Sequence, residues 1–145
     1  MNNAASLVAT FSAPSRLLRR ALLTDATLTA LAGLLLTFAA NPLASLVQLP
    51  AGALRICGVL FIPFAALAAW LGTRPRVHRP LVFAVITLNG LCALDLVLLL
   101  LSGWVEPNLL GELVIAAHAV GIAVLAEAEF LGLRRSTLVE SYSRR

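Results

Sequence analysis

Five polar side chains lie within or beside long apolar runs of this sequence, where hydrocarbon cannot solvate them. They are Arg55, Asn89, Asp95, Glu112 and His118. An acid at the centre of a membrane helix costs about 2.5 kcal/mol or more on insertion scales, so the protein must supply its partners. Counting about 1.5 Å per residue along the expected helices places Arg55, Asp95, Glu112 and His118 in the outer half of one bundle. We therefore expect a polar cluster there, with Asn89 and Asp95 flanking a common helix face.

Two interpretations of this cluster remain open. In a structural one, Asp95 and Arg55 form a buried pair, and His118 hydrogen-bonds a neighbouring helix, which fixes helix register without chemistry. In a functional one, Asp95 and His118 are a proton-responsive pair beside a small cavity, since intramembrane ionisable residues often mark relays or pathways. Haem ligation by His118 would supply one axial ligand only, because His78 lies at a different depth. No cofactor is therefore expected.

Other acids near the apolar runs have expected roles at the membrane interface. Asp25 is expected close to the start of the first helix, where it complements the positive N-terminal end. Glu127 and Glu129 are two residues apart and point to different sides of a helix, so they do not resemble a metal site. We expect them to meet Arg134, Arg135 or the basic turn before the third apolar run.

Motifs of soluble enzymes are missing from the sequence. There is no glycine-rich phosphate loop, no HExxH and no GxSxG. Cys57 and Cys92 form no CxxC pair and are expected at different depths, which disfavours both a vicinal thiol site and a mutual disulfide. The short loops leave little structure outside the membrane for a substrate site, so a non-enzymatic function is expected.

Four apolar runs must hold these residues across a bilayer core of roughly 30 Å. The chain has 145 residues, of which 60% are hydrophobic and 12% are charged, compared with roughly 25% charged residues in soluble domains. The expected spans are residues 21–40, 51–71, 81–102 and 109–131. The segment 42–50 is too short to cross and is expected as a brief helix or loop along the outer interface. Pro63 should kink the second span.

The arginines predict how these spans are oriented. All eleven cations are Arg, and apart from Arg55 they lie before span one, between spans two and three, or after span four. The positive-inside rule then places both termini in the cytoplasm. We expect an all-α integral membrane four-helix bundle, up-down-up-down, with a basic N-terminal segment 1–20, a transmembrane domain 21–133 and a basic tail 134–145. The arginines are expected to contact anionic lipid head groups rather than nucleic acid.

Small residues predict where the helices approach one another closely. One stripe lies on the second span, and a small-xxx-small pair lies on the fourth. The residues of the stripe are Gly58, Ala65, Ala69 and Gly72, and those of the pair are Ala117 and Gly121. We expect both faces to pack against other helices.

Two runs of the sequence also carry a resemblance. They are LPAGALRICGVLFIPFAALAAWL and AVITLNGLCALDLVLLLLSGWVEPNLLGELV, with LP-xxx-LR at the start of span two, a PFA kink, LN within span three, and SGWV-x-P before span four. Over roughly residues 22–135 the chain resembles small, uncharacterised four-span bacterial inner-membrane proteins, and its general plan is similar to DoxX-like four-helix proteins. The resemblance implies a multi-pass bundle in the bacterial inner membrane and transfers no activity.

Two functions are expected from these features. The first is an accessory or partner-binding subunit of a membrane complex, or a homo-oligomer, without enzymatic activity. The alternative is a small transporter or proton-coupled carrier that uses Asp95, with Arg55, Glu112 and His118 as partners. A subunit should co-purify with a larger complex, whereas a carrier should show flux that Asp95→Asn abolishes.

Overall fold

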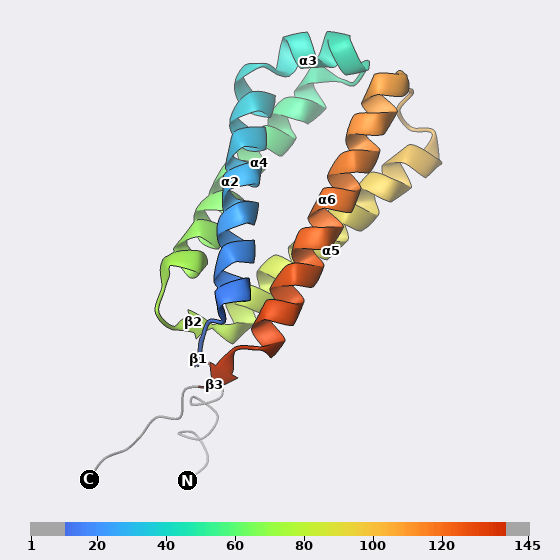
Figure 1. Ribbon diagram of the computed structural model, residues 1–145. Coiled ribbons are helices and arrows are strands. Elements are labelled where there is room, and N and C mark those ends of the chain that lie inside the picture. The colour runs from blue at the N-terminus through green and yellow to red at the C-terminus, as the bar shows by residue number, and fades with distance from the viewer. Residues whose placement is uncertain (1–10, 139–145) are drawn as a thin grey trace, which may run out of the picture.

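The structure, a computed structural model, describes residues 11–138 and contains five helices and three very short strands over that range. Four of the helices are long and apolar enough to cross a membrane: α2 (Arg16–Phe38), α4 (Ala51–Thr73), α5 (Arg79–Ser102) and α6 (Leu109–Arg134). The short α3 (Ala40–Val47) connects α2 to α4 and lies across the end of the bundle opposite the strands (Figure 1). The expected helical fold with four candidate spans is confirmed, and the brief helix α3 begins at Ala40, two residues before the expected segment 42–50.

The first long helix begins at Arg16 because Ser15 caps it. The Ser15 backbone is extended, and its Oγ accepts a hydrogen bond from the Leu18 amide at 3.1 Å. This earlier start places Asp25 about two and a half turns inside α2. Asp25 is 1% exposed. It therefore does not complement the end of the helix, which corrects the expected interfacial role.

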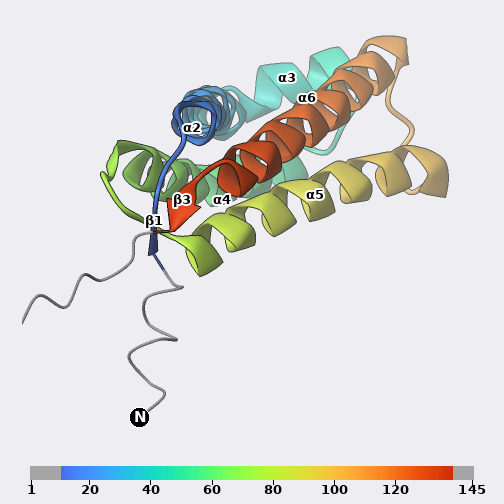
Figure 2. The same ribbon diagram turned by 60° about the horizontal axis from the view of Figure 1, so that its bottom comes forward.

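The long helices pack in a definite order. α2 packs against α4, α5 packs against α6, and α2 also contacts α6. Figure 2 shows α6 between α2 and α5. One apolar core joins all four long helices at the end nearest the strands. Its fully buried members are Leu18 and Leu22 of α2, Leu71 of α4, Val82 and Val85 of α5, Leu133 of α6, and Val77 of the turn before α5.

Glycines allow α2 and α4 to touch almost backbone to backbone. A Cβ atom added at Gly58 would lie 2.6 Å from the Thr37 amide nitrogen and 2.8 Å from the Gly33 carbonyl oxygen. Gly58, Ala65 and Gly72 are all buried. The small-residue stripe predicted on the second span is thus confirmed as a packing face.

The small residues of α6 that meet other helices are different from those expected. Ala117 and Gly121 are exposed, and nothing lies within 4 Å of the position a Gly121 Cβ would take. Instead, Gly132 lies on the Leu18 backbone of α2, and a Cβ there would be 2.6 Å from the Leu18 Cα. Gly111 likewise lies against the Val47 carbonyl. The structure therefore does not place Ala117 and Gly121 against another helix of this chain, and their predicted packing against a helix stays a prediction.

A small sheet that no pattern in the sequence predicts joins distant parts of the chain. Strands β1 (Phe11–Ala13), β2 (Val77–His78) and β3 (Thr137–Leu138) form an antiparallel sheet in the order β2-β1-β3. We call this sheet the terminal clasp. It places the start of α2, the turn before α5 and the end of α6 at one end of the bundle (Figure 1).

Ser15 links the clasp to two helices. Its amide donates to Ser136 Oγ at 3.0 Å, and its hydroxyl donates to the Gly132 carbonyl at 2.7 Å while accepting from Leu18. We expect Ser15→Ala to lower the free energy of unfolding by about 1–2 kcal/mol, because it removes a helix cap and one of the two hydroxyls that donate to the Gly132 carbonyl. Denaturant titration in micelles measures this change.

Ser45→Ala is the matched control for that substitution. The Ser45 hydroxyl is exposed and donates only to the Pro42 carbonyl within α3. Its loss should change the free energy of unfolding by less than about 0.5 kcal/mol. Equal effects of the two substitutions would contradict the linking role of Ser15.

Candidate functional site

The structure does not bring the predicted outer cluster together. Asp95 on α5, Glu112 on α6 and Arg55 on α4 are all exposed. The Arg55 guanidinium donates to the Asn41 side-chain oxygen at 3.2 Å rather than to an acid. Within residues 11–138, no hydrogen bond joins Asp95 to any other member of the cluster. These side chains therefore do not converge as expected. Asp95 and Arg55 also do not form the expected buried pair.

His118 has an aromatic neighbour in place of the expected polar one. It is half-buried on α6, and its ring stacks on Phe61 of α4 with the centroids 6.0 Å apart and the planes at 29°. Such a contact packs α6 near α4 without requiring a hydrogen bond to a helix carbonyl.

Asn89 is the one predicted residue that lies in a buried polar site. Its Nδ2 donates to Asp25 Oδ2 of α2 at 3.0 Å and to Glu129 Oε2 of α6 at 3.3 Å. One amide of α5 thus connects carboxyl groups from two other helices. We call Asp25, Asn89 and Glu129 the acid–amide group.

The acid–amide group is almost completely shielded from the surroundings of the bundle. Asp25 is 1% exposed, Asn89 is 5% exposed and Glu129 is 0% exposed. Asp25 Oδ1 also accepts from the Thr29 hydroxyl at 3.1 Å. Glu129 Oε1 is buried and has no hydrogen-bond partner among the described residues. An unpaired buried polar atom is costly and rare, so this oxygen requires an explanation.

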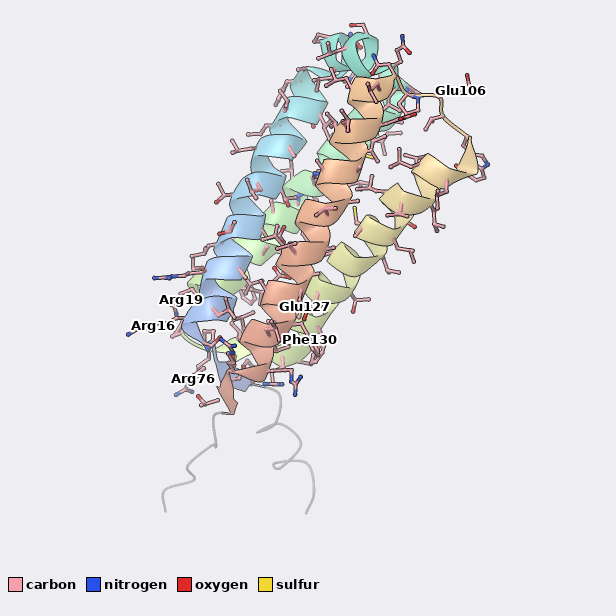
Figure 3. All side chains as sticks on the ribbon, turned by 45° about the vertical axis from the view of Figure 1, so that its right-hand side comes forward. Arg16, Arg19, Arg76, Glu106, Glu127 and Phe130 are labelled. Atoms are coloured by element: carbon pink, nitrogen blue, oxygen red, sulfur yellow. The ribbon has the colours of Figure 1, made fainter. Side chains whose placement is uncertain are left out.

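No described arginine donates a hydrogen bond to either carboxyl. The Arg134 guanidinium lies 5.9 Å from the Phe130 ring centre instead, and Arg135 is exposed. Glu127 is exposed on the other side of α6, near the clasp end of the bundle (Figure 3). The expectation that Glu129 meets Arg134, Arg135 or the basic turn is therefore wrong, because Glu129 faces the bundle interior.

A signal for the acid–amide group was present in the sequence. Each member occupies a three- or four-residue repeat of small and apolar residues that the structure buries. In α2 the repeat is Leu18, Leu22 and Asp25; in α5 it is Val82, Val85, Asn89 and Ala93; in α6 it is Ile115, Ala119, Ile122, Ala126, Glu129 and Leu133. The expected site at Asp95 was placed by depth along the helix alone. Depth does not show which face of the helix a side chain occupies, whereas this repeat does.

The chemistry available to the acid–amide group is proton binding and release. The described residues hold no group of three or more His, Cys, Asp or Glu side chains placed to bind a metal ion. Two adjacent carboxyls with one unpaired oxygen can exchange a proton, and an exchange would alter contacts among three helices.

Comparison of this chain with family models, curated proteins and solved structures finds no match.

Proposed function

We propose that the chain is a multi-pass protein of the bacterial inner membrane, an up-down-up-down bundle with both ends in the cytoplasm. The charge distribution supports this orientation. The exposed or half-exposed arginines at the clasp end are Arg16, Arg19, Arg20, Arg74, Arg76, Arg79, Arg134 and Arg135. Arg55 is the single described cation toward the opposite end. Retention of positive charge in the cytoplasm then directs the clasp end inward.

We further propose that the protein is a small, non-enzymatic, proton-coupled carrier whose proton site is the acid–amide group. The observation that carries this proposal is the burial of Asp25 and Glu129 beside one amide, with no arginine of residues 11–138 bonded to either. Two bare carboxylates side by side in hydrocarbon would be far costlier than a pair that holds a proton. Intramembrane acids that face a bundle interior are typical of proton relays and carriers.

The geometry indicates which atom would hold the proton. Glu129 Oε2 and Asp25 Oδ2 accept from Asn89, and Asp25 Oδ1 accepts from Thr29. Glu129 Oε1 accepts no hydrogen bond from the described residues, so a proton there leaves every hydrogen bond among them intact. When the proton departs, the two carboxylates repel each other, and the contacts of α2 and α6 with α5 must adjust. That adjustment couples proton binding to helix packing.

The proposal is tested by proton flux across liposomes that contain the purified protein and a trapped pH-sensitive dye. The infrared band of a protonated carboxyl supplies an independent measure that needs no substrate. Glu129→Gln should reduce the flux at least tenfold and shrink the band. Flux and band that survive this substitution would overturn the proposal.

A second candidate function, a partner-binding subunit or homo-oligomer, is favoured by one observation. The small residues Ala117 and Gly121 are exposed on α6 with open space above Gly121. In membranes such a small-xxx-small face permits close approach of another helix. The partner would be a second copy or a helix of a larger complex.

We expect Gly121→Ile to disrupt such an association, because a branched side chain would hold the partner helix away. Crosslinking in native membranes and mass measurement in mild detergent should show at least a fivefold loss of the associated form. Leu113→Ile, on an exposed and already bulky site of α6, is the control. An unchanged oligomer in the Gly121→Ile variant would remove the second candidate.

A further inference from the structure

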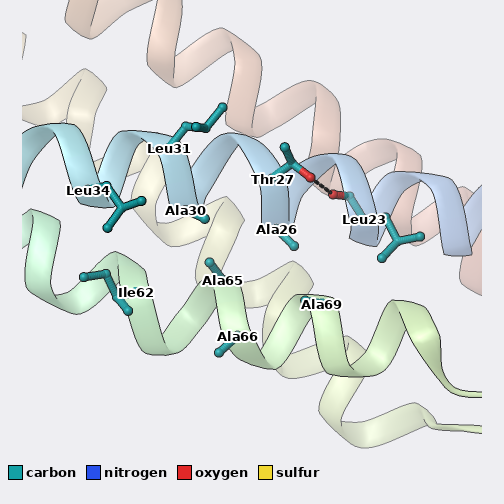
Figure 4. A pocket seen from close by; sticks show the side chains of 10 residues that line it. All are labelled: Leu23, Ala26, Thr27, Ala30, Leu31, Leu34, Ile62, Ala65, Ala66 and Ala69. Atoms are coloured by element: carbon teal, nitrogen blue, oxygen red, sulfur yellow. Dashed lines mark hydrogen bonds between the residues drawn. The ribbon is translucent and has the colours of Figure 1, made fainter.

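An apolar groove follows the contact between α2 and α4. It has a volume of about 530 Å³, and Figure 4 shows side chains of both helices lining it. Small residues such as Ala30 and Ala66 line its middle, and Leu23 and Leu34 mark its extent on α2. Eleven residues of helix correspond to about 16 Å, a length suited to an extended hydrocarbon chain. The single hydroxyl in the lining, that of Thr27, donates to the Leu23 carbonyl and offers nothing to a polar ligand.

The end of the groove nearest the clasp is strongly basic. Arg19 and Arg20 precede Leu23 by about one turn, and Arg74 follows the groove residues of α4. Arg19 Nη2 donates to the Arg74 carbonyl at 3.2 Å, which holds the Arg19 side chain across the gap between the two helices. The Arg74 guanidinium lies 4.8 Å from the ring centre of Trp70. Trp70 is 45% exposed, as interfacial tryptophans are in membrane proteins.

We propose that this groove binds one acyl chain of an anionic phospholipid, with the lipid phosphate against Arg19 and Arg74. The apolar channel fits the chain, and the two guanidinium groups fit the phosphate, which arginine binds through paired N–H donors. No described acid bonds to either arginine, so their charge is available to the lipid. The site is separate from the acid–amide group and stands whether or not a proton is carried.

The experiment uses the full chain purified in mild detergent, and native mass spectrometry counts bound lipid. Phosphatidylglycerol is the anionic probe and phosphatidylcholine is the uncharged reference of similar chain length. We expect one phosphatidylglycerol to be retained where phosphatidylcholine is lost. The double substitution Arg19→Gln and Arg74→Gln should weaken phosphatidylglycerol binding about thirtyfold, since each cation near an anionic lipid contributes a factor of about five.

Two controls separate this site from general basic charge. The double substitution Arg134→Gln and Arg135→Gln removes two charges at the same end of the bundle, one on α6 and one just after it. It should leave the number of bound phosphatidylglycerol molecules unchanged. Ala66→Leu keeps every charge and fills the groove, so it should reduce phosphatidylglycerol retention at least fivefold. Ala66 is exposed, so this variant is expected to fold even if the double arginine variant does not.

Three results would overturn the lipid site. The first is equal retention of phosphatidylglycerol and phosphatidylcholine. The second is a loss of phosphatidylglycerol from the Arg134→Gln, Arg135→Gln variant as large as that from the Arg19→Gln, Arg74→Gln variant. The third is undiminished phosphatidylglycerol binding in Ala66→Leu. A dimer in place of a lipid adduct, lost in the Ala66→Leu variant, would assign the groove to a second copy and would also overturn it. None of these results depends on proton flux.

Discussion

Gly132→Leu is expected to lower the free energy of unfolding by about 3 kcal/mol or more, or to prevent folding altogether. A Cβ at Gly132 would lie 2.6 Å from the Leu18 Cα and 2.9 Å from the Leu18 Cβ. The nearest atoms belong to the α2 backbone, which cannot rotate away as the tip of a side chain can. α6 must therefore separate from α2, which also breaks the Ser15 contact to the Gly132 carbonyl. Denaturant titration of helical circular dichroism in micelles measures the loss.

Gly90→Leu is the matched control on another long helix. Nothing lies within 4 Å of the position that a Gly90 Cβ would take, and leucine favours helix more than glycine does. The free energy of unfolding should stay constant or rise by about 0.5–1 kcal/mol. If Gly90→Leu destabilises the protein as much as Gly132→Leu, the α2–α6 contact is not what makes Gly132 sensitive.

Glu129→Gln is expected to reduce proton flux in proteoliposomes at least tenfold while the bundle still folds. The glutamine side chain has nearly the same shape, and its carbonyl oxygen can still accept from Asn89 Nδ2. It has no carboxyl to gain or lose a proton. Asp25→Asn should act in the same way from the opposite side of the amide. In both variants the protonated-carboxyl infrared band should shrink at neutral pH.

Asp95→Asn tests whether proton flux depends on the acid–amide group or on an acid outside it. Asp95 is exposed on α5 and is outside the acid–amide group, so its neutralisation should leave flux within about twofold of the parent. Flux that depends on Asp95 and not on Glu129 would return the proton site to the outer half of the bundle. That result would overturn the assignment to Glu129.

The long helices were predictable because a bilayer leaves the backbone few alternatives. A run such as residues 81–101 is apolar around almost its whole circumference, with Asn89 and Asp95 as the exceptions, so its length and helical state follow from composition. The same uniform composition does not indicate which face of the helix points into the bundle. Asn89 and Asp95 looked equivalent in the sequence, yet the structure buries Asn89 and exposes Asp95. Rotation is set by contacts such as Gly132 on Leu18, between residues far apart in the chain.

The buried site was missed because two of its members sit near arginines. Asp25 follows Arg19 and Arg20 closely, and Glu129 shortly precedes Arg134 and Arg135, so proximity in sequence favoured interfacial roles. Proximity along a helix does not decide which face a side chain occupies. The clasp strands are two or three residues long, and strands this short carry almost no pattern of their own.

The terminal clasp has a consequence for how the molecule is made. The N-terminus is synthesised first, so β1 stays unpaired until β2 has been translated. β3 joins the sheet only after α6 is complete. The Ser15–Ser136 hydrogen bond spans 121 residues and is among the last contacts to form. Closure of the clasp therefore requires that all four long helices have been synthesised, and a chain truncated before Ser136 would leave one edge of β1 unpaired.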